Sequence, residues 1–525
     1  MKHSITQSYS WLHTWAGLVF GWALVAIFLT GTLAVFDREI TQWMQPEIPT
    51  GNVSRTQAVD TANHYLRQHH PTQERWAVQL PTERSDRLAV SVGEARRGGG
   101  QTILDPATGQ ELAVRETAGG NFFFRFHYTL NLPRNLGIWV VGLMAMAMLA
   151  AIVTGIVIHK KFFKEFFTFR PNKGQRSWLD YHNASGVLLL PFHIMITYTG
   201  LVIFFMIYMP APVDALFNGD RQAYVSELRG TGPGGESRGE PGRGRGAPPA
   251  PMPFIDRTAQ IDFAGLIAQA EARMGPIAGF SLQRRADGQA IFEASPVLGN
   301  VIELTKGRSM AIDALSGRVV REPAASSGAS WVQRVMAGLH FAQFGGYPMR
   351  WLYFICGLIS TAMMAGGLVL FCVKRRRRYA KESPRIRLGY ELIERINIAV
   401  IIGLPLACVG LLWANRLLPV ELSGRASSEI TLFFTVWGAS FVHAALRPWV
   451  SAWREQLWIG AALCLGLPLS NVLAGQPLWG ANQNLYVELT TLALGGLIAL
   501  AAIKVSRPAS EAVSRTGKLS KETLA

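Results

Sequence analysis

The chain has 525 residues, of which 49% are hydrophobic and only 16% are charged. This composition favours a membrane protein over a large soluble enzyme, and the absence of HExxH, GxSxG and Walker motifs argues against common hydrolases and P-loop nucleotide-binding proteins. The formal net charge of +16 would suit nucleic acid, but the basic residues cluster directly after apolar segments, as in membrane proteins. We therefore expect a membrane protein with no nucleic-acid partner.

Eight apolar segments are candidate membrane spans, because a helix needs roughly 20 residues to cross a bilayer. Four of them contain no Asp, Glu, Lys or Arg, namely residues 14–36, 135–158, 181–213 and 351–373. Four weaker candidates follow at residues 396–415, at 430–446, within 456–487 before Gly475, and at 486–503. The last is short and carries Glu488 at its edge, so seven spans are the alternative.

These segments divide the chain into membrane-spanning parts, exported modules and basic loops. They are a first transmembrane segment (1–37), an exported module (38–134), transmembrane segments 2 and 3 with a basic loop (135–210), a second exported module (211–350), a fourth span (351–373), a second basic loop (374–395), four additional spans (396–506) and a tail (507–525). The first apolar run is too long for a cleaved signal peptide, so we expect it to remain as an anchor.

The distribution of Lys and Arg predicts the orientation. Basic residues are dense at 160–176 and at 374–387, each directly after an even-numbered span. Positively charged loops stay in the cytoplasm. We therefore expect both termini and both basic loops to be cytoplasmic, and both modules to be exported.

Both exported modules are predicted to be small α+β units. In the first, residues 55–69 have helical periodicity, and 76–80 and 88–92 alternate like strands; in the second, the helix is at 263–274 and the strands are at 278–283 and 290–294. Each module also contains an Asp-x-x-Ser/Thr-Gly sequence, at 105–109 and at 313–317, which is typical of a turn. An insert at 230–251 is rich in Gly, Pro and Arg, and we expect it to be disordered.

Two histidines occupy the same place in a repeated sequence. His13 and His182 each follow a tryptophan and a leucine closely, and each precedes a glycine by four residues and a Thr-Gly pair by seventeen. A second pair, His127 and His340, lies in aromatic segments shortly before the second and fourth spans. The repeated unit of span, module, histidine segment and span implies an approximate two-fold axis along the membrane normal.

This symmetry predicts two facing histidine pairs, His13 with His182 near the cytoplasmic side and His127 with His340 near the exported side. Polar residues within spans are costly and usually functional. Neutral imidazole is the usual protein ligand of haem b iron, and two facing helices can supply both axial ligands. We therefore predict two haem b groups, held without covalent attachment because the chain has no CxxCH motif.

Other assignments remain open at this point. His193 lies eleven residues after His182, which places both on one face of a straight helix, so a rival scheme uses His193 as a ligand. His159 at the end of the second span is an interfacial cap or a ligand. The histidine pairs could instead tie the two repeats together by hydrogen bonds. A zinc site is less favoured because zinc usually takes three or four clustered ligands, and His443 is more typical of a packing histidine.

The chain resembles a known family at several motifs. They are Trp11-Leu12-His13-x3-Gly17 with Thr30-Gly31, Phe126-His127-Tyr128-x-Leu130, Ile158-His159-Lys160-Lys161-Phe162, Asp180-Tyr181-His182-Asn183 with Leu190-Pro191-Phe192, and Leu339-His340-Phe341. At these motifs, over about residues 1–380, the chain resembles the PepSY-associated transmembrane family. The four spans after Pro384 depart from the minimal four-helix pattern of that family.

The resemblance implies a bacterial inner-membrane protein with two periplasmic PepSY domains in tandem. Because the family includes haem-containing ferric-siderophore reductases, it also implies transfer of electrons, from quinol or a cytoplasmic reductant, to a ferric siderophore or other ferric chelate. No residue is singled out as catalytic. The alternative is a non-enzymatic membrane anchor whose PepSY modules bind a periplasmic protein or peptidase, and a transporter is a third hypothesis.

Overall fold

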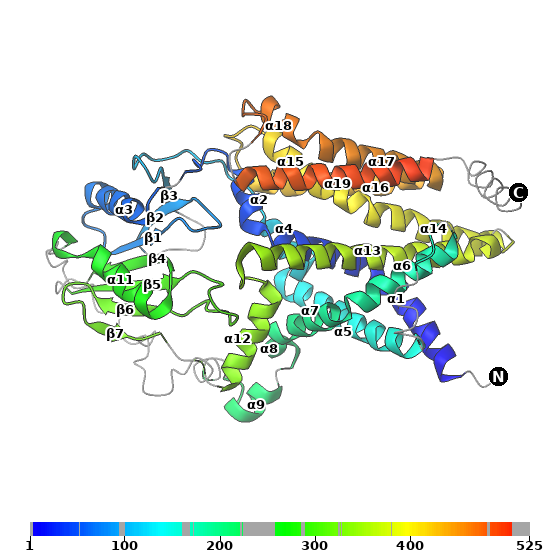
Figure 1. The fold of residues 1–525 in the computed structure, drawn as a ribbon, viewed down its shortest axis with the longest axis horizontal. Coiled ribbons are helices and arrows are strands. Elements are labelled where there is room, and N and C mark those ends of the chain that lie inside the picture. Colours follow the sequence, from blue (N-terminus) through cyan, green and yellow to red (C-terminus); the bar gives the residue numbers. More distant parts are fainter. Residues whose placement is uncertain are drawn as a thin grey trace, which may run out of the picture.

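The computed structural model has a β-sheet at one end and a long bundle of helices at the other (Figure 1). It describes residues 4–506, except for 52, 94–99, 160–168, 172, 210, 221–222, 224–257, 285–288, 324–325, 327, 380 and 480–482. The insert expected at 230–251, most of the first basic loop and the tail after residue 506 lie outside the described residues.

The helical bundle consists of long apolar helices. Their bounds are α1 (Ile5–Ala34), α5 (Arg134–Ile158), α6 (Gln175–Leu188), α7 (Leu190–Ile203), α13 (Gly346–Tyr379), α14 (Pro384–Ile401), α15 (Gly403–Leu417), α16 (Arg425–Leu446), α17 (Trp449–Leu465), α18 (Leu467–Leu473) and α19 (Gln483–Ser506). Among the described residues, six stretches are long and apolar enough to cross a membrane, or eight if the bent pairs α6–α7 and α17–α18 each count as one span. The chain is therefore a multi-pass, mostly helical membrane protein, in agreement with the predicted eight spans.

The third predicted span is bent. α6 and α7 meet at an angle of 64°, and Pro191 stands at the start of α7, where the ring cannot continue the hydrogen bonds of the preceding helix. The helix that carries His182 and His193 is therefore not straight, although both residues line the same cavity.

The sheet combines strands from both segments that precede the histidines. Its order is β3-β2-β1-β4-β5-β6-β7, and all neighbouring strands are antiparallel. The strands are β1 (Arg75–Gln79), β2 (Leu88–Val92), β3 (Gln101–Leu104), β4 (Ile277–Arg284), β5 (Ala290–Pro296), β6 (Met310–Asp313) and β7 (Val319–Arg321). In each segment a helix, α3 (Arg55–His69) or α11 (Phe263–Met274), precedes a run of antiparallel strands.

The two expected modules form one continuous sheet with one core, so they are not separate domains. β1 pairs with β4, with Trp76 opposite Leu282 and Val78 opposite Phe280. Leu66 of α3 and Phe292 of β5 belong to the same buried cluster. Pairing β1 with β4 removes two exposed strand edges, which would otherwise attract other chains.

Both predicted turns are present. Asp105 Oδ1 accepts hydrogen bonds from the backbone N–H of Ala107 and Thr108, and Asp313 Oδ1 accepts one from Ser316. The Ser316 hydroxyl also donates to Asp313 Oδ1. The hydrogen bonds from the backbone N–H and the hydroxyl of Ser316 hold the pKa of Asp313 below its usual value. The glycines that end the turns have φ of 77° and 70°, the left-handed region that glycine tolerates best.

Short helices join the sheet to the bundle. α4 (Asn121–Thr129) precedes α5 and carries His127, and α12 (Gly328–Phe341) precedes α13 and carries His340. α2 (Asp37–Met44) follows α1, and its Glu39 forms a buried ion pair with Arg84 from the sheet side. The remaining short elements are α8 (Phe205–Tyr208), α9 (Ala211–Phe217) and the 3-10 turn η1 (Thr258–Gln260).

Candidate functional site

Four histidines come together as two pairs inside the bundle. The rings of His13 on α1 and His182 on α6 lie with their centroids 6.2 Å apart and their planes at 71°. Those of His127 on α4 and His340 on α12 are 5.9 Å apart, with their planes at 34°. The structure thus brings together the same partners that the repeat predicts.

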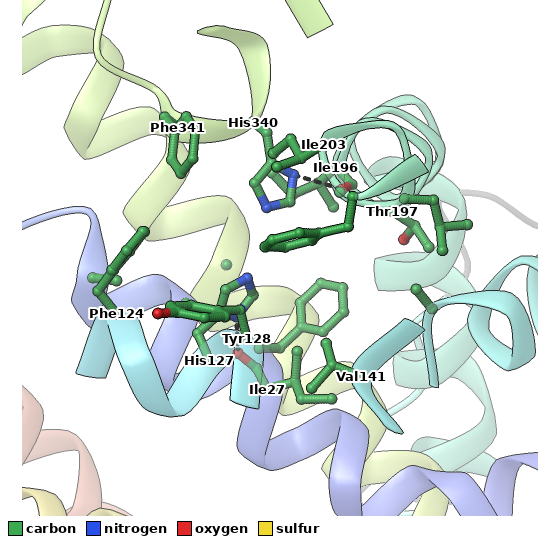
Figure 2. Close-up of a pocket in the computed structure, with 18 of the residues that line it drawn as sticks. Ile27, Phe124, His127, Tyr128, Val141, Ile196, Thr197, Ile203, His340 and Phe341 are labelled. Carbon is green, nitrogen blue, oxygen red and sulfur yellow. Dashed lines mark hydrogen bonds between the residues drawn. The ribbon is translucent and has the colours of Figure 1, made fainter. Parts of the chain in front are cut away.

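Each of the four rings is oriented by a backbone carbonyl of a neighbouring helix. Nδ1 lies 2.8 to 3.0 Å from a carbonyl oxygen in every case, with His13 on Ala151, His182 on Met363, His127 on Ile27 and His340 on Ile196. A carbonyl can only accept, so Nδ1 carries the proton and Nε2 keeps a lone pair. In Figure 2 the second nitrogen of His127 and that of His340 point toward each other.

The sheet-side pair is partly buried, and this favours the neutral form of its imidazoles. Both residues lie on helices outside the candidate spans. Burial lowers the pKa of His127 below its usual value and that of His340 to about 3. Neutral imidazole is the form that binds a metal.

A glycine lies four residues after each carbonyl that accepts from a histidine. The four carbonyl–glycine pairs are Ile27 and Gly31, Ala151 and Gly155, Ile196 and Gly200, and Met363 and Gly367. A Cβ at Gly31 would lie 2.6 Å from His127 Nδ1, and one at Gly200 would lie 2.8 Å from His340 Cε1. At Gly367 and Gly155 the nearest atoms of His182 and His13 are at 3.1 and 3.4 Å. These glycines leave room for the rings to reach the helix backbone.

Sequence reasoning found part of this arrangement. Gly31 and Gly200 belong to the repeated Thr-Gly pairs, but their role as seats for histidine rings on other helices was not anticipated. Gly155 and Gly367 were missed altogether. The sequence signal is a glycine within an apolar span, which by itself points equally to ordinary helix packing.

Each histidine pair lines its own cavity. The sheet-side cavity has a volume of about 360 Å³ and is lined by apolar and aromatic side chains with His127 and His340 (Figure 2). The second cavity has a volume of about 480 Å³ and is lined by His13 and His182. Leu24 and Met148 line both, so the two cavities share a wall.

Two basic side chains line each cavity. They are Arg134 and Lys306 at the sheet-side cavity, and Lys374 and Arg375 at the other. A site of this kind, apolar with a few polar groups and a pair of cations, suits a flat apolar ligand with an anionic edge.

His193 and His159 also line the larger cavity, but they are placed differently from the four paired histidines. His193 is buried, and its Nε2 lies 2.8 Å from Ser360 Oγ. His159 stands at the C-terminal end of α5. His443 bonds Glu455 and Gln456 within the added helices, as expected for a packing histidine.

The geometry suits a metal with two axial protein ligands. With a metal–nitrogen bond of about 2 Å on each side, two imidazole centroids lie about 6 Å apart, close to the separations in both pairs. Within the described part of the chain, no group of three or more His, Cys, Asp or Glu residues could hold a metal ion.

The chain matches a known protein family. The model of the PepSY-associated TM region matches residues 10–374. The chain belongs to this family. All four paired histidines fall within the matched residues, whereas α14 to α19 lie beyond them. Among curated proteins, none matches the chain.

Proposed function

We propose that this PepSY-associated membrane protein is a di-haem oxidoreductase that passes electrons across the bacterial inner membrane to a ferric siderophore or another ferric chelate. The single observation that carries the proposal is that four histidines face each other in two pairs, His13 with His182 and His127 with His340. Each pair lines its own cavity, and each ring is fixed through Nδ1 so that Nε2 keeps its lone pair. Fixing a ligand histidine in this way orients it and raises its basicity.

Open space and basic side chains in the cavities support haem b as the bound group. Gly17 and Gly186 line the larger cavity one turn after His13 and His182, and a Cβ at either would meet nothing within 4 Å. This open space suits a flat macrocycle. In each cavity the two basic side chains would pair with the two propionates of a haem.

The arrangement of the cavities supports electron transfer along the bundle. Haem iron, when bound, supplies reversible one-electron chemistry. The protein's own part is to hold the two groups near each other, with Leu24 and Met148 between them, and to exclude water through the aromatic lining around His127 and His340. Electrons would enter at the His13–His182 side, from quinol or a cytoplasmic reductant, and leave at the sheet side.

The direction of transfer follows from the proposed orientation. The C-terminal end of α13, which carries the basic residues 374–378, and the start of α14 lie at the end of the bundle away from the sheet (Figure 1). By the positive-inside rule that end is cytoplasmic, and the sheet is periplasmic. The two halves of the sheet would correspond to two PepSY modules in tandem, on which a bulky chelate could rest.

Reoxidation kinetics test this function. Dithionite-reduced protein mixed with ferric siderophore should be reoxidised, and His127→Ala or His340→Ala should slow reoxidation more than it slows reduction of the remaining haem. Protein that stays reduced with every ferric chelate, yet reacts with a quinone, would contradict the reductase. A colourless, haem-free protein would favour the anchor that binds a periplasmic protein or peptidase.

A further inference from the structure

The helices beyond the family match contact the helix that carries His127. Phe433 of α16 packs against Phe122 and Phe126 of α4, with ring centroids 4.8 and 5.7 Å apart. Phe434 and Trp437 of α16 lie 6.1 Å from the ring of Phe126. Phe126 directly precedes His127 in the chain. α16 therefore packs against α4 next to the residue that carries the imidazole.

A buried ion pair of α16 also holds the segment before α4. Arg425 and Glu429 bond each other and are fully buried. Glu429 Oε2 accepts hydrogen bonds of 2.8 Å from the Thr117 hydroxyl and from the Ala118 backbone N–H. Arg425 donates to the backbone carbonyl of Glu116 at 2.9 Å. The chain is therefore fixed on α16 a few residues before α4 begins at Asn121.

The second carboxylate oxygen ties this ion pair to another added helix. Asn415 of α15 donates to Glu429 Oε1 at 2.8 Å, and Arg115 donates to the Asn415 carbonyl at 3.1 Å. A buried charge held by several hydrogen bonds is rigid, because any movement would leave a group unsatisfied. The segment before α4 is thus held in place by hydrogen bonds to α15 and α16.

The rings of the other histidine pair are hydrogen-bonded to α5 and α13 rather than to α1 and α7. His13 is bonded to α5 through Ala151, and His182 is bonded to α13 through Met363. A change in the part of α16 that meets α4 should therefore move one pair and leave the other in place.

We infer that α15 and α16 serve the sheet-side histidine pair: Phe433 and the Arg425–Glu429 pair of α16 position α4, and with it the His127 imidazole. The inference rests on the proposed function only in that a haem between His127 and His340 reports the effect. Phe433 and Glu429 are positioning residues, since neither lines the cavity.

Hydrogen–deuterium exchange and redox titration of full-length Phe433→Ala and Glu429→Gln test the inference. Exchange at residues 115–129 should rise while exchange at residues 5–20 is unchanged. In the titration, the midpoint of one haem component should shift and its low-spin ferric EPR signal should change, with the other component unmoved. Phe433→Leu, which keeps much of the apolar bulk, should recover most of the wild-type behaviour.

Leu432→Ala is the matched control, because Leu432 is the neighbouring residue on α16 and is 37% exposed. It should leave both measurements unchanged. Equal shifts in both haem components, or unchanged exchange at residues 115–129 in both test variants, would overturn the inference. A haem-free wild type would instead contradict the proposed function, and the exchange measurement would still decide whether α16 positions α4.

Discussion

Gly31 determines whether the His127 ring can reach the carbonyl oxygen of Ile27. A Cβ at this position would lie 2.6 Å from Nδ1, so Gly31→Ala should displace the ring and break its hydrogen bond. Loss of a group that orients a ligand typically weakens metal binding about 10–100-fold. We predict a loss of this order in haem affinity at the sheet-side cavity, measured by haem titration of the apoprotein.

Gly438→Ala is the control for this substitution, because it adds the same methyl group to a helix where a Cβ meets nothing within 4 Å. It should bind haem like the wild type. If Gly31→Ala also kept its full affinity, the contact between glycine and histidine ring would have no part in the site.

His193 separates the two ligand schemes. Its Nε2 already lies at hydrogen-bond distance from Ser360, and the equivalent residue of the first repeat is Leu24. We predict that His193→Leu keeps both haems, as judged by pyridine haemochrome assay and the α-band of the reduced protein. Loss of one haem in this variant would support the rival scheme in which His193 is an axial ligand.

The histidine pairs were predictable because they repeat at fixed spacing. A residue type that recurs in an apolar context at the same interval marks a position, and symmetry then supplies the partner. The glycine seats were not predictable in the same way. The carbonyl of Ala151 accepts from His13, and Gly155 contacts its ring, from a helix more than 130 residues away. Spacing along one helix carries no information about which other helix packs on it.

At the scale of elements, β1 and β4 decide whether the sheet is one unit. A Cβ at Gly279 on β4 would lie 2.3 Å from the carbonyl oxygen of Val78 on β1, so Gly279→Val should force these strands apart. Overpacking of this kind costs about 1–3 kcal/mol. We predict that hydrogen exchange then rises in β2 as well as in β5, because the two halves share a core. Unchanged protection of β2 would show that the halves are independent.

The sequence predicted β1, β2, β4 and β5, but it did not predict β3, β6 or β7, nor the arrangement of the strands. Alternation of apolar and polar residues identifies strands such as β1 and β2, but it does not show which other strand pairs with their edges. The bend between α6 and α7 is a similar case. Pro191 is visible in the sequence, yet proline is tolerated in the first turn of a helix and inside membrane helices, so its presence alone did not indicate a break.

At the scale of the whole molecule, the sheet and the turn between α13 and α14 lie at opposite ends (Figure 1). The proposed orientation puts Thr108 in the periplasm and Gln175 in the cytoplasm. We predict that an impermeant maleimide labels Thr108→Cys in intact spheroplasts and labels Gln175→Cys only after permeabilisation. The native Cys372, Cys408 and Cys464 are buried and Cys356 is partly buried, so the labelling of the protein without either substitution gives the background. The opposite labelling pattern would invert the direction of electron transfer.

The added helices, α14 to α19, extend the bundle beyond the residues that match the family. Hydropathy predicted four added spans, and the described residues give three, or four if the bent pair α17–α18 counts as one. The contact of α16 with α4 was not predicted, because the aromatic residues of α16 are indistinguishable in sequence from lipid-facing ones. Through this contact α16 packs against α4, the helix that carries His127.

Haem stoichiometry in full-length protein tests the central claim most directly. The pyridine haemochrome assay should give two haem b per chain for the wild type and close to one for His13→Ala, His182→Ala, His127→Ala and His340→Ala. Double variants within one pair should also keep one haem, and a double variant across the pairs should keep none. A haem-free wild type, or single variants that all retain two haems with unchanged spectra, would contradict the account.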